Sequence, residues 1–148
     1  MVATFIGHSN CHIPYEDVKK EVENLIKYGV TLFLNGGMGQ FDFICAKAVF
    51  ELKPLYPEIK SLLVIPYLSF KCHFVTLFDE SIYPMELENY YYKSAIVKRN
   101  EYLVNESDVA LCYVYTLGRC LKTYARAKKR HLTLFHLCQP PKLEDISL

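Results

Sequence analysis

The chain has 148 residues, of which 51% are hydrophobic and 22% charged, a composition typical of a folded protein and a length that suits one compact domain. Lys and Arg total 17 against 16 Asp and Glu, so the net charge is +1. A nearly neutral chain lacks the broad basic surface of proteins that bind many phosphates along a nucleic acid, and we therefore disfavour nucleic acid as a partner.

Membrane, metal and cofactor binding are disfavoured as well. No apolar stretch approaches the length of a membrane span, and no secretory signal precedes the first predicted strand, so we expect a cytoplasmic protein without membrane contact. The six cysteines form no C-x-x-C pair and fit no zinc spacing, and the five histidines show no metal spacing with one another. We expect free thiols, no metal and no cofactor.

In the first half of the chain, apolar strands alternate with helices. A buried strand over 2–6 ends at a glycine, and the helix that follows opens at Pro14 and closes at Gly29. The second strand, over 31–34, leads through a glycine-rich loop into a helix with an apolar face, which ends before Pro54.

The second half continues this alternation less regularly. Its elements are, in chain order, a strand over 61–65, a short helix near 70–78, a longer helical segment over 85–106 that breaks near Tyr92, a strand over 109–114, a helix over 122–129 and a strand over 132–136. Strands that are apolar throughout indicate burial on both faces, and helical crossovers indicate parallel pairing. We therefore predict a doubly wound, Rossmann-like α/β sandwich of about five mainly parallel strands, with a single domain over 1–138 and a polar tail over 139–148.

The glycine-rich loop after the second predicted strand is the strongest functional signal. The segment Asn35-Gly-Gly-Met-Gly-Gln-Phe-Asp42 follows a strand and precedes a helix, at the edge where such sheets bind ligands. Glycine allows the backbone to approach a ligand closely, and the free N–H groups of the helix suit a phosphate; the alternative is a tight turn without a ligand. The candidates from this loop are Gly36, Gly37, Gly39, Phe41 and Asp42, where Asp42 either caps the helix or accepts a hydrogen bond from a ribose hydroxyl.

Other segments supply candidates at the same edge of the sheet. They are Gly7 and His8 after the first strand, Arg99 and Asn100 in the helix before the fourth strand, and Gly118, Arg119, Cys120 and Thr123 after it. His8 is either a phosphate donor or acid–base group, or a surface residue that forms hydrogen bonds. The guanidinium of Arg99 suits a phosphate if it faces the crevice, and otherwise lies on a solvated face. The cations that follow, over 122–130, extend the positive charge, although the helix dipole alone favours cations in a last turn.

These motifs together resemble the YpsA-like branch of the SLOG superfamily, which also includes the DNA-processing protein DprA and the Lonely-guy phosphoribohydrolases. The matching elements are, in order, Gly7-His8, Gly36-Gly-Met-Gly-Gln-Phe-Asp42, Leu63-Val-Ile-Pro-Tyr67, Arg99-Asn100 with Ser107-Asp108, and the segment from Gly118 to Ala125. They extend over nearly the whole chain. The resemblance implies a Rossmann-like fold, a pocket for nucleotides or ADP-ribose-like ligands, and homo-oligomerisation.

The sequence departs from these relatives at several positions. Arg119 stands where the YpsA-like family usually has a second glycine, and Ser9 stands where it often has Arg. The Lonely-guy enzymes carry a Glu for glycosidic cleavage where this chain has Ala125. Because leaving-group departure and water attack need a positioned acid or base, this difference argues against the same hydrolysis. Asp42 and Glu101 are the remaining catalytic candidates.

Three functions stay open at this stage. The leading one is a sensor or sequestering module that binds a nucleotide or ADP-ribose-like ligand without turnover. The second is an N-glycosidase or phosphoribohydrolase acting on nucleoside monophosphates, and the missing Glu counts against it. The third, by analogy with DprA, is binding of single-stranded nucleic acid, which the cations over 122–130 favour and the net charge of +1 disfavours.

Overall fold

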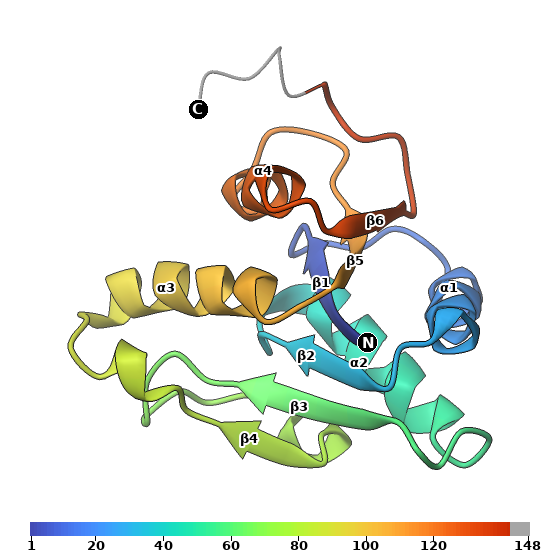
Figure 1. Cartoon of the computed structure of the whole chain (residues 1–148), viewed down its shortest axis with the longest axis horizontal. Coiled ribbons are helices and arrows are strands. Elements are labelled where there is room, and N and C mark those ends of the chain that lie inside the picture. The colour runs from blue at the N-terminus through green and yellow to red at the C-terminus, as the bar shows by residue number, and fades with distance from the viewer. Residues whose placement is uncertain (143–148) are drawn as a thin grey trace.

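Residues 1–142, which the computed structural model describes, are built on one six-stranded parallel sheet. Its strands are β1 Val2–Gly7, β2 Leu32–Asn35, β3 Lys60–Val64, β4 Glu80–Ile82, β5 Val109–Tyr113 and β6 Thr133–His136. Their order across the sheet is β4-β3-β2-β1-β5-β6 (Figure 1). This confirms the predicted Rossmann-like α/β sandwich, with six strands in place of about five.

Within these residues, α-helices cover both faces of the sheet. They are α1 Tyr15–Tyr28, α2 Gly39–Leu52, α3 Tyr92–Asn105 and α4 Leu121–Lys129, and two short 3-10 turns, η1 Val75–Leu77 and η2 Met85–Leu87, precede α3. Phe5 of β1 packs in the core that α1 and α2 cover, whereas its neighbour Ile6 packs in the core beneath α4. Because successive side chains of a strand point to opposite faces, this alternation buries both faces of β1 and explains why its sequence is mostly apolar.

Strand β4 is the element that the sequence did not reveal. Its three residues are exposed or half-buried and form no apolar run. The strand is positioned instead by Asp79, whose carboxylate accepts a hydrogen bond from the Ser61 N–H over 2.8 Å and whose own N–H donates to the Ser61 carbonyl over 2.9 Å. Asp79 also pairs with Lys53 just after α2. Contacts of this kind join distant residues and leave no periodicity in the sequence.

The segment between β3 and α3 differs most from the prediction. The short helix expected near 70–78 is reduced to the 3-10 turn η1, and the helical segment expected over 85–106 is divided into η2 and α3. Helix α3 begins at Tyr92, where the break was predicted, and the preceding Tyr91 is 89% exposed. Self-association through this tyrosine-rich surface stays a prediction.

The centre of the sheet contains its topological switch point. Strand β1 lies between β2 and β5, and Gly7 at the end of β1 is in register with Tyr113 at the end of β5. From β1 the chain passes into α1 on one face, and from β5 it passes into α4 on the other. The two loops therefore diverge and leave a crevice at the carboxyl ends of the strands, where open α/β sheets bind their ligands.

The structure describes only part of the predicted C-terminal tail. Residues 139–142 form no helix or strand, and the rest of the predicted tail, 143–148, lies outside the described residues. The division into a domain over 1–138 and a tail over 139–148 stays a prediction. Within the described part of the chain, none of the helices has the length and apolar character needed to cross a bilayer.

Candidate functional site

A cavity of about 310 Å³ lies at the switch point, beyond the carboxyl ends of β1 and β5. It is lined by Gly7, His8, Ser9, Asn10, Tyr115, Arg119 and Cys120. Four of these were candidates from the sequence, and the structure brings them together. Ser9, Asn10 and Tyr115 were not selected, because an isolated hydroxyl, amide or aromatic ring in a loop carries no motif. Their position directly after a predicted strand is the signal that would have identified them.

His8 forms the wall between the two loops of the cavity. Its Nε2 accepts a hydrogen bond from the Tyr115 N–H over 3.2 Å, and the two rings lie 4.5 Å apart in an edge-on arrangement. A Cβ atom at Gly118 would lie 3.0 Å from Nδ1 of His8, so glycine lets the β5 loop pass close to the imidazole. Burial lowers the pKa of His8, which keeps the ring neutral and able to accept this bond at neutral pH.

Cys120 lies against the other ring nitrogen, with its Sγ 3.4 Å from Nδ1 of His8. Because Nε2 of the neutral ring accepts from Tyr115, Nδ1 carries the proton and points it toward the sulfur. His8 in this tautomer has no lone pair to take a proton from the thiol. Burial raises the pKa of Cys120 to about 11, so the residue is a thiol and not a nucleophilic thiolate at neutral pH.

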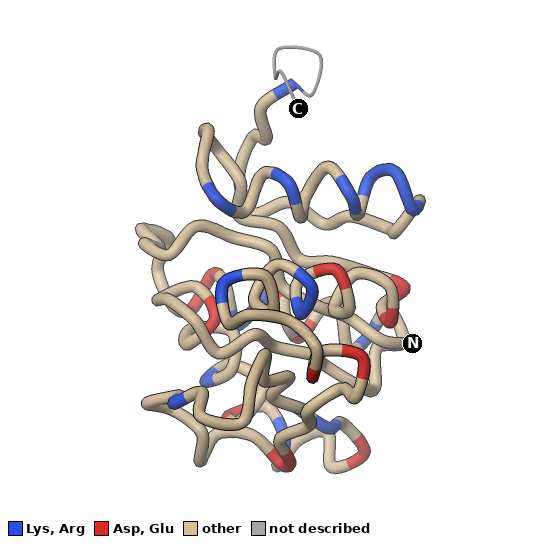
Figure 2. Tube along the Cα trace, turned by 90° about the vertical axis from the view of Figure 1, so that its left-hand side faces the viewer, with Lys and Arg blue, Asp and Glu red and all other residues tan. Residues whose placement is uncertain are grey.

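The cationic rim of the cavity is the N-terminal end of α4. Arg119 and Lys122 are exposed, and neither forms an ion pair within residues 1–142. Thr123 lies half-buried in the same first turn. The first N–H groups of a helix have no intrahelical acceptor and carry a partial positive charge, so this end suits an anion. Figure 2 shows that cations continue along the helix to its far end.

The glycine-rich loop after β2 lies beside this cavity and is held by its own hydrogen bonds. The Asn35 side chain accepts from the Gly37 N–H over 2.8 Å and donates to the Asp42 carbonyl over 2.9 Å. Gly39 has a φ of 87°, and a Cβ there would lie 3.0 Å from Cα of Ser9. The Gln40 N–H donates to the Ser9 carbonyl over 2.6 Å. The glycines therefore allow the start of α2 to pack directly against the β1 loop.

Phe41 and Asp42 were both ligand candidates from the sequence. In the structure, the Phe41 ring packs in the core and the Asp42 carboxylate bonds to the backbone of the protein itself. Phe41 is 1% exposed, and its ring lies beneath Gly7, where a Cβ atom would come within 2.3 Å of it. The Asp42 carboxylate accepts from the Met38 N–H over 3.0 Å and so closes the first turn of α2. Burial raises the pKa of Asp42 to about 6, against the opposing effects of this bond and of Arg99. Of the two predicted roles for Asp42, capping is the one that the contacts display, and ribose binding stays a prediction.

Arg99 is turned inward. Its side chain is 1% exposed, and Nη1 donates to the Gly36 carbonyl over 2.6 Å and to the Val64 carbonyl over 2.9 Å. Its Nε donates to Oδ1 of Asn100 over 3.0 Å. Arg99 thus joins the glycine-rich loop to the end of β3, and Asn100 orients it. Neither residue lines the switch-point cavity.

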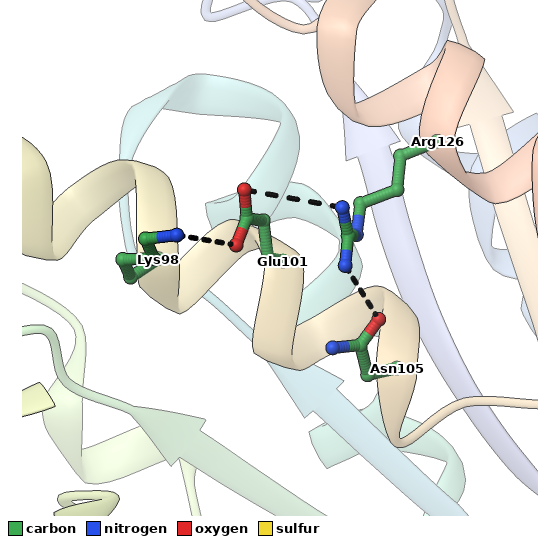
Figure 3. A network of polar contacts seen from close by, with 4 residues as sticks. All are labelled: Lys98, Glu101, Asn105 and Arg126. Atoms are coloured by element: carbon green, nitrogen blue, oxygen red, sulfur yellow. Dashed lines mark hydrogen bonds and ion pairs between the residues drawn. The ribbon is translucent and has the colours of Figure 1, made fainter. Parts of the chain in front are cut away.

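Glu101, the second catalytic candidate, lies away from the cavity. Figure 3 shows it on α3 between two cations, with carboxylate oxygens 3.3 Å from Lys98 Nζ and 3.9 Å from Nη1 of Arg126. Arg126 also donates to Asn105 over 3.3 Å, so the network joins α3 to α4. Glu101 borders a separate groove of about 140 Å³. This position supports helix packing and does not support acid–base chemistry at the switch point.

Comparison with known proteins places this geometry in a structural class. No family model and no curated protein matches the sequence. DNA processing protein A from Helicobacter pylori, solved for its single-stranded DNA binding mode, aligns with a TM-score of 0.65 and 18% identity over 94% of this chain and 66% of its own. DprA from Streptococcus pneumoniae aligns with a TM-score of 0.68 and 14% identity over 90% of this chain and 49% of its own. The chain has the fold of the matched part of DNA processing protein A.

These identities show the fold alone, and the chain spans 66% and 49% of the lengths of the two proteins. The shared fold agrees with the resemblance to the SLOG superfamily, of which DprA is a member. Assignment to the YpsA-like branch stays a prediction.

The sequence-based argument against nucleic acid as a partner is wrong. A protein with this fold binds single-stranded DNA. The fold is therefore compatible with a nucleic-acid partner. The argument depended on the net charge of +1, and a sum over the chain does not show where the charges lie. Helix α4 concentrates cations on one surface, whereas acidic residues such as Glu16 and Asp17 lie on α1. A nearly neutral chain can therefore carry a local basic surface.

Proposed function

We propose that the chain is a SLOG protein of the YpsA-like branch that binds a nucleotide or nucleotide-derived, ADP-ribose-like ligand in the switch-point cavity. The observation that carries the proposal is the position of the cavity. It lies where a doubly wound sheet reverses its strand order, and its rim holds Arg119, an exposed arginine without an ion pair in the described part of the chain.

The cavity offers distinct surfaces for the two ends of a nucleotide. A phosphate at the N-terminal end of α4 would accept hydrogen bonds from Arg119 and from the first N–H groups of the helix. Tyr115 is 43% exposed and presents an aromatic face for a base. The volume of about 310 Å³ falls at the lower end of the range for small-molecule sites. The site therefore suits a mononucleotide unit.

The site favours binding over turnover. No carboxylate is among the residues that line the cavity. The Cys120 thiol holds its proton, and the Nε2 lone pair of His8 is occupied by the Tyr115 N–H. Cleavage of an N-glycosidic bond needs a positioned acid or base, and no side chain of the lining meets this need. We therefore propose a sensor or sequestering role, with the phosphoribohydrolase function as the disfavoured alternative.

Calorimetry with AMP and ADP-ribose tests this proposal. We expect saturable binding that Arg119→Ala weakens by about tenfold, because it removes one charge-assisted phosphate contact. Arg130→Ala is the matched control, since Arg130 is an exposed arginine at the far end of α4, and it should leave the affinity unchanged. Chromatography should recover the ligand intact. Release of free base, or absence of binding, would contradict the proposal.

Single-stranded nucleic acid is the second candidate, because of the basic surface of α4. The exposed cations of this surface are Arg119, Lys122, Lys128, Lys129 and Arg130 (Figure 2). Fluorescence anisotropy with a labelled oligo-dT tests it. If this candidate is correct, Arg130→Ala weakens oligonucleotide binding as much as Arg119→Ala does, and the affinity falls steeply with salt. Salt-independent anisotropy, or no change in anisotropy, would exclude it.

A further inference from the structure

Helix α2 presents phenylalanines to solvent where the neighbouring helix α1 presents charged residues. Both helices pack against the same core cluster. The exposed positions of α1 include Glu16, Asp17 and Lys20, which form the polar outer face that is usual for a surface helix. On α2, by contrast, Phe43 is 40% exposed and Phe50 is 50% exposed. A helix that is apolar on its outer face as well as its inner face is normally covered on both.

The exposed phenylalanines belong to one apolar surface that extends beyond the helix. Phe43 and Phe50 are two helical turns apart and therefore lie on the same side of α2. The Phe43 ring packs edge-on against Phe74, which directly precedes η1, with ring centroids 5.3 Å apart. The next residue, Val75, is 46% exposed. Single exposed apolar residues are ordinary, whereas adjoining ones mark sites of protein contact. We call these four residues the α2 face.

The charged side chains beside the α2 face are turned toward α1. Lys47, which lies between the two phenylalanines in the sequence, holds its Nζ 4.4 Å from the centroid of the Tyr15 ring. Glu51 accepts a hydrogen bond from the Tyr15 hydroxyl over 2.7 Å and lies 3.9 Å from Lys19 Nζ. The α2 face is therefore apolar and offers little to the phosphates of a nucleic acid or a lipid headgroup. An apolar surface of the same kind is its natural complement, because no charge has to be matched.

We propose that the α2 face is the interface of a symmetric homodimer, in which two copies of α2 pack antiparallel across a two-fold axis. In such an interface each contact occurs twice, with the two residues exchanged. An axis that passes midway between Phe43 and Phe50, near Lys47, places Phe43 against Phe50 of the partner subunit and the reverse. The surface lies on the face of the sheet opposite α4. It is also separate from the tyrosine-rich surface before α3, where the hydroxyl groups make exposure to water less costly.

Sedimentation equilibrium of the purified chain tests the proposal. We expect the wild type to be a dimer, and Phe50→Lys should raise the dissociation constant by at least about tenfold, because it places a charge at the centre of the interface. Tyr91→Lys is the matched control, since it places the same charge at an aromatic position that is 89% exposed and outside the α2 face. It should leave the dissociation constant unchanged. Thermal unfolding of each variant confirms that the fold is intact.

A charge exchange tests the antiparallel pairing itself. Phe43→Lys alone and Phe50→Glu alone each place an unpaired charge in the interface and should weaken the dimer. The double variant Phe43→Lys/Phe50→Glu brings opposite charges together across the axis, so it should associate at least about tenfold more tightly than either single variant. A wild type that is monomeric at every concentration would overturn the proposal. So would a dimer that Tyr91→Lys dissociates and Phe50→Lys leaves intact, or a double variant no tighter than the single ones.

Discussion

The main-chain N–H of Tyr115 donates to Nε2 of His8 over 3.2 Å and links the loop after β5 to the loop after β1. This bond requires a neutral imidazole, because a protonated ring has no lone pair at Nε2. The ring also fills the space that the missing Cβ of Gly118 leaves open. The shape of the switch-point cavity therefore depends on the charge state of one histidine.

Acid should loosen this link before it unfolds the protein. The pKa of His8 is lowered from 6.5 by burial, so its contribution to stability is present above pH 6.5 and is lost as the pH falls through the folded-state pKa. We expect His8→Ala to cost about 1 kcal/mol of unfolding free energy at pH 7.5 and less at pH 5.5. Urea unfolding at the two pH values measures this. His12→Ala, at an exposed histidine of the same loop, is the matched control for the loss of an imidazole from this loop.

Asp42 should impose the opposite pH dependence. Its pKa rises from 3.8 to about 6 in the folded state, so the folded protein holds a proton that the unfolded chain has released, and stability falls as the pH rises from about 4 to about 6. Asp42→Asn keeps an oxygen for the Met38 N–H and removes the titration. We expect the variant to gain about 1–3 kcal/mol relative to the wild type between pH 4 and pH 7. A constant difference between the two proteins over this range would contradict the assignment.

Cys120 should react slowly with alkylating agents at neutral pH. Burial raises the pKa of its thiol to about 11, and alkylation proceeds through the thiolate. The rate of iodoacetamide labelling, followed by mass spectrometry of the Cys120 peptide, should increase tenfold per pH unit up to pH 10 without levelling. A plateau below pH 8 would reveal a stabilised thiolate and would reopen nucleophilic chemistry in the cavity.

The fold was predictable because apolar runs dominate it. Buried strands such as β1 and β5 are apolar at nearly every position, and the caps Pro14 and Gly29 define α1 closely. Strand β4 was missed because it is three residues long, lies at the edge of the sheet and depends on contacts of Asp79. Edge strands of this kind bury too little apolar surface to produce a hydrophobic pattern in the sequence.

The location of the site was more predictable than the orientation of its side chains. The rule that ligands bind at strand ends selected His8, Arg119 and Cys120, which line one cavity. Arg99 was selected on the condition that its guanidinium faces the crevice and binds a phosphate, yet this guanidinium is buried against a carbonyl 63 residues away in the chain. Sequence alone does not show whether an arginine on a helix points into a crevice or into the core, because acceptors for its N–H groups come from backbone of any sequence.

Loss of Arg99 should therefore destabilise the whole domain. Arg99→Met leaves the Gly36 and Val64 carbonyls without a donor in a buried environment, and we expect a cost of about 3–5 kcal/mol in unfolding free energy. Lys98→Met is the matched control at the adjacent position, where a partly exposed ion pair with Glu101 contributes little. Urea unfolding of both variants measures the two losses in unfolding free energy. A loss below 1 kcal/mol for Arg99→Met would mean that water or backbone movement satisfies the two carbonyls.

Gly7 should tolerate no side chain, for steric reasons alone. An alanine Cβ at this position would lie 2.3 Å from Cδ2 of Phe41, a ring that is itself 1% exposed and in contact with Tyr113 in the core. We expect Gly7→Ala to cost about 1–3 kcal/mol, the range for overpacking a well-packed interior. Phe41→Leu shortens the opposing side chain, so in the double variant the two losses should be less than additive by at least 0.5 kcal/mol, roughly the threshold for coupling between neighbours. Strict additivity would show that position 7 needs glycine for its backbone conformation and not to leave room for the Phe41 ring.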